Sequence, residues 1–202
     1  MRSEIISIDA ASRCAEMDCV PFSNVADASA YIPSEYIIKL VTERWEQREA
    51  ARLRRAVFCA EQGLFDRDDR DDIDRRASNI VAVSCVSGMP EQVVGTVRIH
   101  EEEPGHWQGS RLAVLKEYRR VALLGTELIQ LAVGTAHARG AQKFTAQVQS
   151  QNVPLFRRLH WNTLEEIVLR GKPHHRMEAN LAHYPPCTTG ERGFVTMLRQ
   201  AA

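Results

Sequence analysis

The alternation of hydrophobic and polar residues predicts a chain that mixes strands with helices. Short apolar runs rich in β-branched residues have the length and composition of strands. These runs cover residues 36–41, 80–86, 92–99, 111–115, 144–148, 165–169 and 176–181. Segments with a helical period cover residues 43–62, 123–139 and 154–159. Because strands and helices are interspersed, and several strands follow one another directly, the order predicts an α+β fold.

The ends of the predicted helices are marked by residues with specific backbone preferences. Thr42 is suited to cap the first helix, and Gly63 follows its last turn. Leu124 and Leu128 share one face of the second long helix, which Gly140 ends. These signals predict two amphipathic helices, each with one face in the core.

The pattern changes near residue 35 and again near residue 182. Residues 1–34 show no sustained period, which predicts an irregular N-terminal arm. Residues 35–182 hold the predicted strands and helices and form the domain, and residues 183–202 form a C-terminal tail. Inside the domain, residues 66–76 alternate Asp with Arg, which predicts a solvated loop whose aspartates pair with arginines of the same run.

Composition narrows the classes of function. Among 202 residues, 26 are Lys or Arg and 26 are Asp or Glu, so no net charge favours nucleic acid or a membrane surface as a partner. No run of about 18 apolar residues and no signal peptide is found, so we expect a cytoplasmic protein that spans no membrane. The five cysteines are scattered without a Cys-x-x-Cys pair. We therefore expect neither a disulfide framework nor a metal site.

One segment, residues 111–126, combines the features of a phosphate site. A predicted strand leads into a basic turn with Arg119 and Arg120, and Gly125 lies at the opening of a long helix. The free N–H groups and positive dipole end of a helix start suit a bound phosphate. The arginines and the Thr126 hydroxyl can add hydrogen bonds, and Gly125 lets a ligand approach the backbone closely. The segment therefore predicts a site for a phosphorylated ligand.

Four motifs in chain order resemble the GNAT acetyltransferase superfamily. Residues 111–126 are similar to its acetyl-CoA motif, a Leu-x-Val strand, then Tyr-Arg, then Arg/Gln-x-x-Gly-x-Gly/Ala, but Leu123 stands where the family has glycine. Residues 152–161 resemble the family's Asn-containing region. Residues 55–62 (Arg-Ala-Val-Phe-Cys-Ala-Glu-Gln) and 171–178 resemble the start and the ending of one branch. As a whole, residues 36–181 resemble the bacterial nitrogen-starvation acetyltransferases.

The resemblance implies a mixed, mostly antiparallel sheet with splayed central strands, flanked by helices. It also implies acetyl-CoA as cosubstrate, with pantetheine along the strand that ends at Val114 and the Val114 N–H beside the thioester oxygen. The reaction that it implies is transfer of the acetyl group to a small polar amine. The implied contacts of the cosubstrate are Leu112, Ala113, Val114, Arg119, Arg120, Val121, Ala122, Leu123, Leu124, Gly125, Thr126, Asn152 and Phe156.

The resemblance leaves the general base open. Many relatives have a Glu and a Tyr where this chain has Gln147 and Phe156, neither of which exchanges a proton near neutral pH. We expect the base to be Glu101, Glu102 or Glu103, because like charges crowded in a cleft favour proton uptake by one carboxylate. The other candidates are His100 and Glu61. The predicted acceptor contacts are Phe58, Glu61, Gln62 and His174.

Two other functions stay open, and so does a homodimeric assembly. An acyl-homoserine-lactone synthase of the same fold would need a long acyl tunnel and a carrier-protein partner. A sensor that binds acyl-CoA without turnover would be compatible with Gln147 and Phe156. Medium and large side chains are predicted to pack around Leu124 and Leu128, with Phe58, Phe144 and Phe156 filling space. We therefore expect the pocket to end just beyond an acetyl methyl group.

Overall fold

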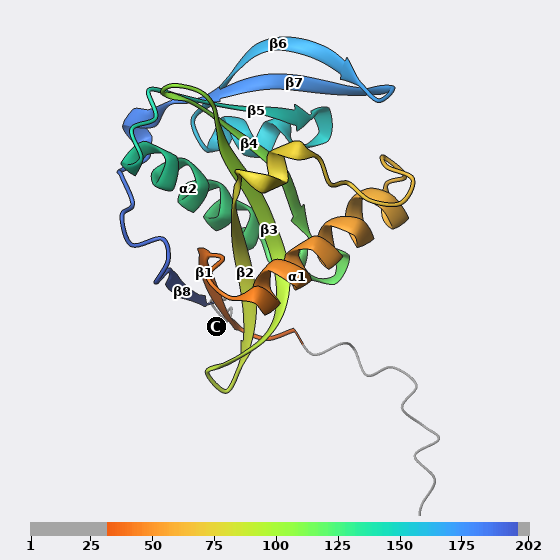
Figure 1. Cartoon of the computed structure of the whole chain (residues 1–202), viewed down its shortest axis with the longest axis vertical. Helices are drawn as coiled ribbons and strands as arrows, with labels where there is room; N and C mark the ends of the chain where they lie inside the picture. The colour runs from red at the N-terminus through yellow and green to blue at the C-terminus, as the bar shows by residue number, and fades with distance from the viewer. Residues whose placement is uncertain (1–31, 198–202) are drawn as a thin grey trace, which may run out of the picture. The chain divides into compact units, whose positions relative to one another are not determined.

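One eight-stranded sheet organises the described part of the chain, residues 32–197 of a computed structural model. Its strand order is β6-β7-β5-β4-β3-β2-β1-β8, and Figure 1 shows the β6–β7 hairpin at one end and β1 and β8 at the other. Neighbouring strands are antiparallel except for β4 and β5, which are parallel. The predicted mixed, mostly antiparallel sheet is confirmed.

Each strand and helix that the pattern predicts is present, with shifted boundaries. The strands are β1 Glu35–Leu40, β2 Ser78–Val86, β3 Met89–Glu103, β4 His106–Val114, β5 Lys143–Gln149, β6 Trp161–Leu169, β7 Lys172–Ala179 and β8 Phe194–Met197. The helices are α1 Arg44–Arg54, α2 Ala122–Ala138 and α3 Val153–Arg158, and a π-helical turn, Arg55–Glu61, continues α1.

The two long helices cover opposite faces of the sheet. Leu124 and Leu128 of α2 pack in the larger core with Ile80, whereas Leu53 of α1 packs in a second core with Val81. Ile80 and Val81 are adjacent in β2, and successive side chains of a strand point to opposite faces. The sheet therefore separates two apolar layers, one beneath each long helix.

The predicted helix ends agree with the structure, except that the first helix is capped one residue later than expected. α1 begins after Glu43, and the Glu46 carboxylate accepts the N–H groups of Thr42 at 2.9 Å and of Glu43 at 3.1 Å. Glu43 is therefore the capping residue, and the prediction of Thr42 was one residue off. Gly63, with φ +60°, ends the π-helical turn, and Gly140, with φ +91°, follows α2, as predicted.

The polar stretch at residues 101–110 belongs to the sheet, although the pattern left it between strands. β3 continues to Glu103 and β4 begins at His106, with Glu101 opposite Trp107 and Arg98 opposite Ser110. The predicted strands stopped short of this stretch because it has few apolar side chains, although its backbone is paired in the sheet. The long β3–β4 hairpin extends the sheet beyond the predicted strand.

The sheet also extends beyond the predicted domain end at residue 182. In the segment assigned to a tail, β8 pairs with β1 along Glu35–Ile38. This short strand is mostly exposed and therefore has no strong apolar pattern. The predicted N-terminal arm, residues 1–34, lies outside the described residues except for 32–34.

The Asp-Arg run at residues 66–76 is held to the sheet by buried charges. Asp69 is 1% exposed and accepts hydrogen bonds from Arg54 Nε at 2.7 Å and from Arg111 Nε at 2.9 Å. Arg54 belongs to α1 and Arg111 to β4. The prediction of a solvated loop paired within itself was therefore wrong at this residue, because arginines distant in sequence reach it.

A third sheet-facing arginine, Arg98 of β3, completes this cluster. Its guanidinium donates to both carboxylate oxygens of Asp71, at 2.6 and 3.1 Å, and lies 3.1 Å from Asp74 Oδ2. Burial alone would raise the pKa of Asp74, but the hydrogen bonds from Arg54 and the charge of Arg98 hold that pKa well below its usual range. The charges of Asp71 and Asp74 thus stabilise the loop over the sheet.

Candidate functional site

The parallel strands β4 and β5 separate before either of them ends. Their last pair is Gly109 with Ala146, although β4 continues to Val114 and β5 to Gln149. A cavity of about 1170 Å³ lies at the resulting gap and is lined from both faces of the sheet. The splayed central strands implied by the family resemblance are therefore present, and they open the sheet at its centre.

The free edge of β4 directs one N–H group toward this gap. Leu115 donates its N–H to the Val94 carbonyl at 2.9 Å, so the backbone of Leu115 faces β3. Because successive residues of a strand alternate in direction, Val114, opposite Gly95, directs its N–H away from β3. No described residue of β5 pairs with Val114. Its N–H is available to a ligand at the position expected for the oxyanion donor.

The start of α2 lies on the same cavity. Val121, Gly125 and Thr126 line it, and the first turn of a helix has N–H groups without partners in the helix. A Cβ at Gly125 would meet only Leu155 Cδ2, at 3.9 Å, which is ordinary contact. The protein's own packing therefore does not require glycine at position 125, and the space beside it is open to a ligand.

The other predicted contacts of the α2 segment are distributed differently. Arg120 is exposed and does not line the cavity, and Leu124 is fully buried in the core. Leu123 is also outside the lining, and the side chain of Ala122 lies outside the described ones. Because a helix turns by about 100° per residue, only part of a continuous motif can face one ligand. Of the described residues from 120 to 126, those that line the cavity are Val121, Gly125 and Thr126.

Arg119 lines the cavity but already has a carboxylate partner. Its Nη1 and Nη2 atoms donate to the two oxygens of Glu61 at 2.6 and 2.7 Å, and its Nε donates to the Val114 carbonyl at 3.0 Å. These hydrogen bonds lower the pKa of Glu61. The pair joins the π-helical turn to the loop before α2, so a predicted acceptor contact and a predicted phosphate contact bind each other.

The region around α3 supplies the opposite wall. Asn152 and Phe156 line the cavity, and the Phe156 ring packs edge-on against Trp161 with centroids 4.9 Å apart. Arg158 also lines the cavity and was missed from the sequence. A basic residue in the last turn of a short helix is a common surface feature, so no local signal distinguished it.

The predicted acceptor residues meet on the α1 face of the sheet. Phe58, Glu61, Gln62 and His174 all line the cavity, and Gln62 accepts a hydrogen bond from Gln149 Nε2 at 3.0 Å. His174 pairs with Gln149 across β7 and β5, so the two side chains lie on one face. Residues far apart in sequence therefore form one polar wall.

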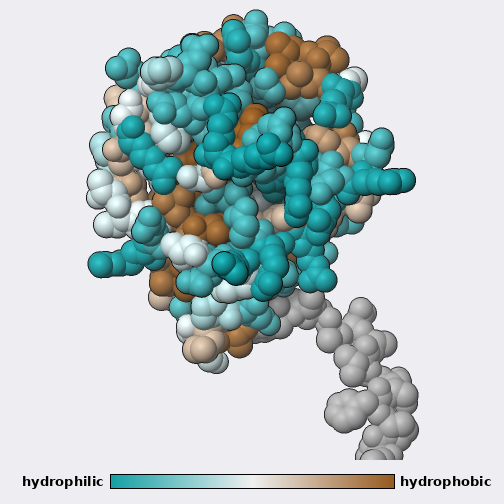
Figure 2. All heavy atoms as spheres, viewed as in Figure 1, coloured by the Kyte–Doolittle hydropathy of each residue, from teal (hydrophilic) through white to brown (hydrophobic). Residues whose placement is uncertain are grey.

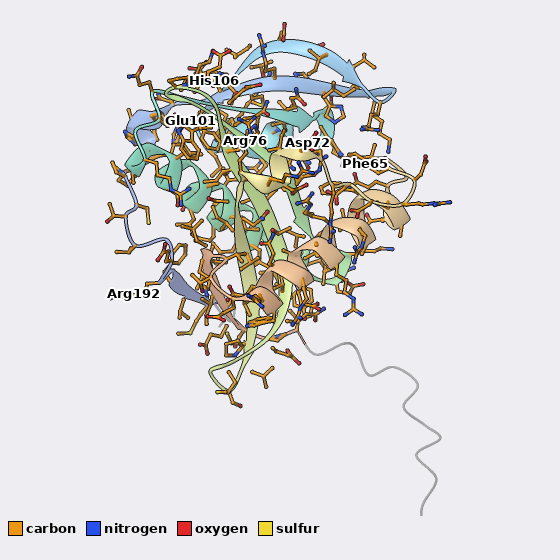
Figure 3. The ribbon with its side chains drawn as sticks, viewed as in Figure 1. Phe65, Asp72, Arg76, Glu101, His106 and Arg192 are labelled. Carbon is orange, nitrogen blue, oxygen red and sulfur yellow. The ribbon has the colours of Figure 1, made fainter. Side chains whose placement is uncertain are left out.

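The three predicted base residues lie elsewhere. Glu101, Glu102 and Glu103 are exposed at the end of β3 and do not line the cavity. Glu101 accepts the N–H of Gly105 in the hairpin turn at 2.9 Å. In Figure 3, Glu101 is well separated from Phe65, which does line the cavity. The expected crowding inside a cleft is absent, because β3 carries these residues past the splayed region.

The sequence reading also missed cationic residues at the β6–β7 turn. Arg170 lies over the Phe65 ring, 4.1 Å from its centroid, and Lys172 donates to the Gln62 carbonyl at 3.2 Å. Both line the cavity. The sequence Arg-Gly-Lys signals a turn, but only the folded hairpin brings this turn to the cavity.

The described residues contain no group of three or more His, Cys, Asp or Glu side chains placed to hold a metal ion, and no helix long and apolar enough to cross a membrane. Figure 2 shows a mostly hydrophilic face, with hydrophobic atoms at the end of the sheet formed by β6 and β7. In β6, Leu164 and Val168 are exposed.

Comparison with known proteins agrees with this architecture. The model of the acetyltransferase (GNAT) family matches residues 38–161. A Bacillus subtilis (strain 168) protein named "Putative acetyltransferase BSU40680" is 28% identical over 140 residues, covering 68% of this chain and 91% of the relative. Because the family model spans more than half of the chain, the protein belongs to the GNAT acetyltransferase family and is an acyltransferase. Membership of the nitrogen-starvation branch stays a prediction.

Solved structures show the same fold at lower sequence identity. A "putative N-acetyltransferase from Lactobacillus plantarum" has a TM-score of 0.64 and 19% identity, covering 71% of this chain and 97% of that chain. The CoA-dependent acyl-homoserine lactone synthase BjaI has a TM-score of 0.60 and 16% identity, covering 71% of this chain and 82% of that chain. Proteins with this fold therefore include one titled a "putative N-acetyltransferase" and an acyl-homoserine lactone synthase.

Proposed function

We propose that the protein transfers the acetyl group of acetyl-CoA to a small polar amine by direct aminolysis of the thioester. The observation that carries this proposal is the cavity at the β4–β5 gap, which connects the start of α2 with the polar wall of Gln62 and His174. The α2 end suits the phosphates of CoA, and the polar wall suits an amine. The gap between them suits the thioester.

The free edge of β4 supports this reaction. When the amine attacks the thioester carbonyl, negative charge develops on the carbonyl oxygen. The N–H of Val114 is oriented to stabilise that charge. The leaving group is a thiolate, and an ordinary thiol has a pKa of about 8.5, so departure does not require an acid at the position of Phe156.

A longer acyl donor is the second candidate, because the cavity also reaches the apolar face beneath α2. We expected packing to end the pocket at the acetyl methyl group, with Phe144 and Phe156 filling space. Instead both rings line the cavity. Further lining residues on that face are Val97, Ile129, Ala132, Val133 and Trp161.

Binding of acetyl-, butyryl-, hexanoyl- and octanoyl-CoA by calorimetry separates the two donors. Each methylene buried on binding contributes about 0.8 kcal/mol. Affinity that does not rise beyond acetyl-CoA supports the acetyl proposal. A steady rise to octanoyl-CoA would replace it with long-chain acyl transfer.

Release of CoA thiol from acetyl-CoA over a panel of small polar amines tests the transfer itself. We expect release that depends on one class of amine, with an N-acetyl product in equal amount by mass spectrometry. Tight binding of acetyl-CoA without thiol release from any amine would instead indicate an acyl-CoA sensor.

A further inference from the structure

His174 is held in one orientation at the polar wall of the cavity. It is 8% exposed, and its Nδ1 lies 2.9 Å from the Lys172 carbonyl oxygen. A carbonyl only accepts hydrogen bonds, so Nδ1 carries the hydrogen. In the neutral ring, Nε2 then holds the free lone pair. No described residue forms a hydrogen bond with Nε2, and this atom is not fully enclosed by the protein.

The other titratable side chains of the cavity wall are unsuited to accept a proton. Glu61 is the only carboxylate among the described lining residues, and Arg119 binds both of its oxygens. Arg111, Arg158, Arg170 and Lys172 are cations that have no free acceptor. Burial raises the pKa of Glu127 in α2, but Glu127 does not line the cavity.

Resting on the acetyl-transfer function proposed above, we propose that His174 is the general base of the reaction. Nε2 takes one proton from the ammonium group of the acceptor, and the amine lone pair attacks the carbonyl carbon of the thioester. The C–N bond forms as the carbonyl π electrons move to oxygen. The C–S bond breaks as the carbonyl re-forms, and the second ammonium proton passes through solvent to the thiolate. The imidazolium returns its proton to solvent.

Cationic, anionic and neutral side chains surround His174. On its own strand, Lys172 and Arg176 lie two residues away on the same face, and Arg176 pairs with Glu165 of β6 at 3.0 Å. Across the other edge, β5 presents the neutral Gln147 and Gln149. The charged groups above this face and at the β6–β7 turn are Glu61, Arg119 and Arg170.

His175 is a matched control, because it is the neighbouring histidine of the same strand on the opposite face. It lies opposite Val148, which belongs to the α2-side core, and it does not line the cavity. A change that merely disturbs β7 should affect both histidines. A change in proton transfer should affect only His174.

The experiment measures kcat and KM for CoA thiol release against pH in the wild type, His174→Gln, His174→Asn and His175→Gln. Asn is included because its amide can still donate to the Lys172 carbonyl. We expect both His174 variants to lose roughly 10²- to 10⁴-fold in kcat, the usual contribution of a general base. Their acetyl-CoA affinity by calorimetry should be unchanged, the acidic limb of the kcat profile should disappear, and added imidazole should restore part of the rate. His175→Gln should retain the wild-type rate and profile.

Retention of rate and acidic limb in both His174 variants would overturn the inference while leaving acetyl transfer intact. Loss of acetyl-CoA binding in both variants would assign His174 a structural role instead. If the wild type itself releases no thiol with any amine, the proposed function fails and the inference fails with it.

Discussion

Two regions of the molecule are rich in cations but pair them with different partners. One is the charge cluster that Arg54, Arg98 and Arg111 form with the Asp-Arg run at residues 66–76, and the other is the wall of the cavity. In the cluster, Arg54 and Arg98 are almost fully buried and each donates to carboxylates at 2.6–3.1 Å. In the cavity wall, Arg170 and Lys172 donate to backbone carbonyls, at 3.3 and 3.2 Å. A buried charge paired internally contributes to structure, whereas a cation with spare donors beside a cavity is available to a ligand.

Two glycines of α2 repeat the contrast on one helix. A Cβ at Gly134 would lie 3.0 Å from the Pro185 carbonyl oxygen and 3.3 Å from Cys187 Cβ. At Gly125 the space is open toward the cavity. A side chain at Gly134 would therefore crowd the protein's own chain, whereas the space at Gly125 is open to a ligand.

The largest expected effect is on the charge cluster. Asp69→Asn should lower the free energy of unfolding by about 3 kcal/mol, because it removes the buried carboxylate that Arg54 and Arg111 share and leaves them only their less buried partners, Asp74 and Asp71. Denaturant unfolding checks this, with Asp72→Asn as control, since among the described residues Asp72 forms an ion pair only with the exposed Arg75. Equal stability of the two variants would contradict a structural role for the cluster.

Acid should also lower the free energy of unfolding through this cluster, by somewhat less than Asp69→Asn does. The folded-state pKa values of Asp71 and Asp74 lie below their ordinary values, so the unfolded chain binds more protons. Their contribution is complete above the ordinary Asp pKa of about 4 and is lost as pH falls through the folded-state values. We expect a loss on the order of 2 kcal/mol, measured by unfolding at successive pH values. Asp74→Asn should reduce this dependence, and an unchanged slope would argue against it.

The glycine pair should separate binding from folding. Gly125→Val should weaken acetyl-CoA binding by roughly 1–3 kcal/mol, the range for one or two lost charge-assisted hydrogen bonds, with the fold retained. Gly134→Ala should instead lower the free energy of unfolding by about 1–3 kcal/mol, since its Cβ overpacks against the chain near Pro185. Calorimetry and thermal unfolding of both variants decide it, and unchanged affinity in folded Gly125→Val would remove the phosphate site from α2.

The smallest effect concerns the glutamates first expected to supply the base. Because Glu102 and Glu103 are exposed and outside the cavity wall, changing either to Gln should leave kcat for thiol release at the wild-type value. A steady-state assay at saturating acetyl-CoA measures this. A fall in kcat for one variant alone would return the base to the β3–β4 hairpin.

Features that depend on neighbours in the chain could be predicted from the sequence alone. The helix ends at Gly63 and Gly140 follow from the backbone freedom of glycine, and the apolar face of α1 follows from a 3.6-residue period. The prediction of one buried face was wrong for α2, because residues 131–136 are all buried. Residues 111–126 also resemble the GNAT acetyl-CoA motif, and this resemblance, with three further motifs in chain order, indicated the family. Local physics was sufficient for the helix ends and for the apolar face of α1.

Only the tertiary structure decided which distant residues meet. The gap after Gly109 and Ala146, the burial of Asp69 against Arg54 and Arg111, and the position of His174 beside Gln149 depend on strand order and register. Strand pairing joins residues far apart in the chain, and the hydrophobic period of a strand indicates which of its faces is buried but not which strand lies beside it. For the same reason, three adjacent glutamates looked like a catalytic cluster in the sequence, whereas β3 carries them out of the cavity.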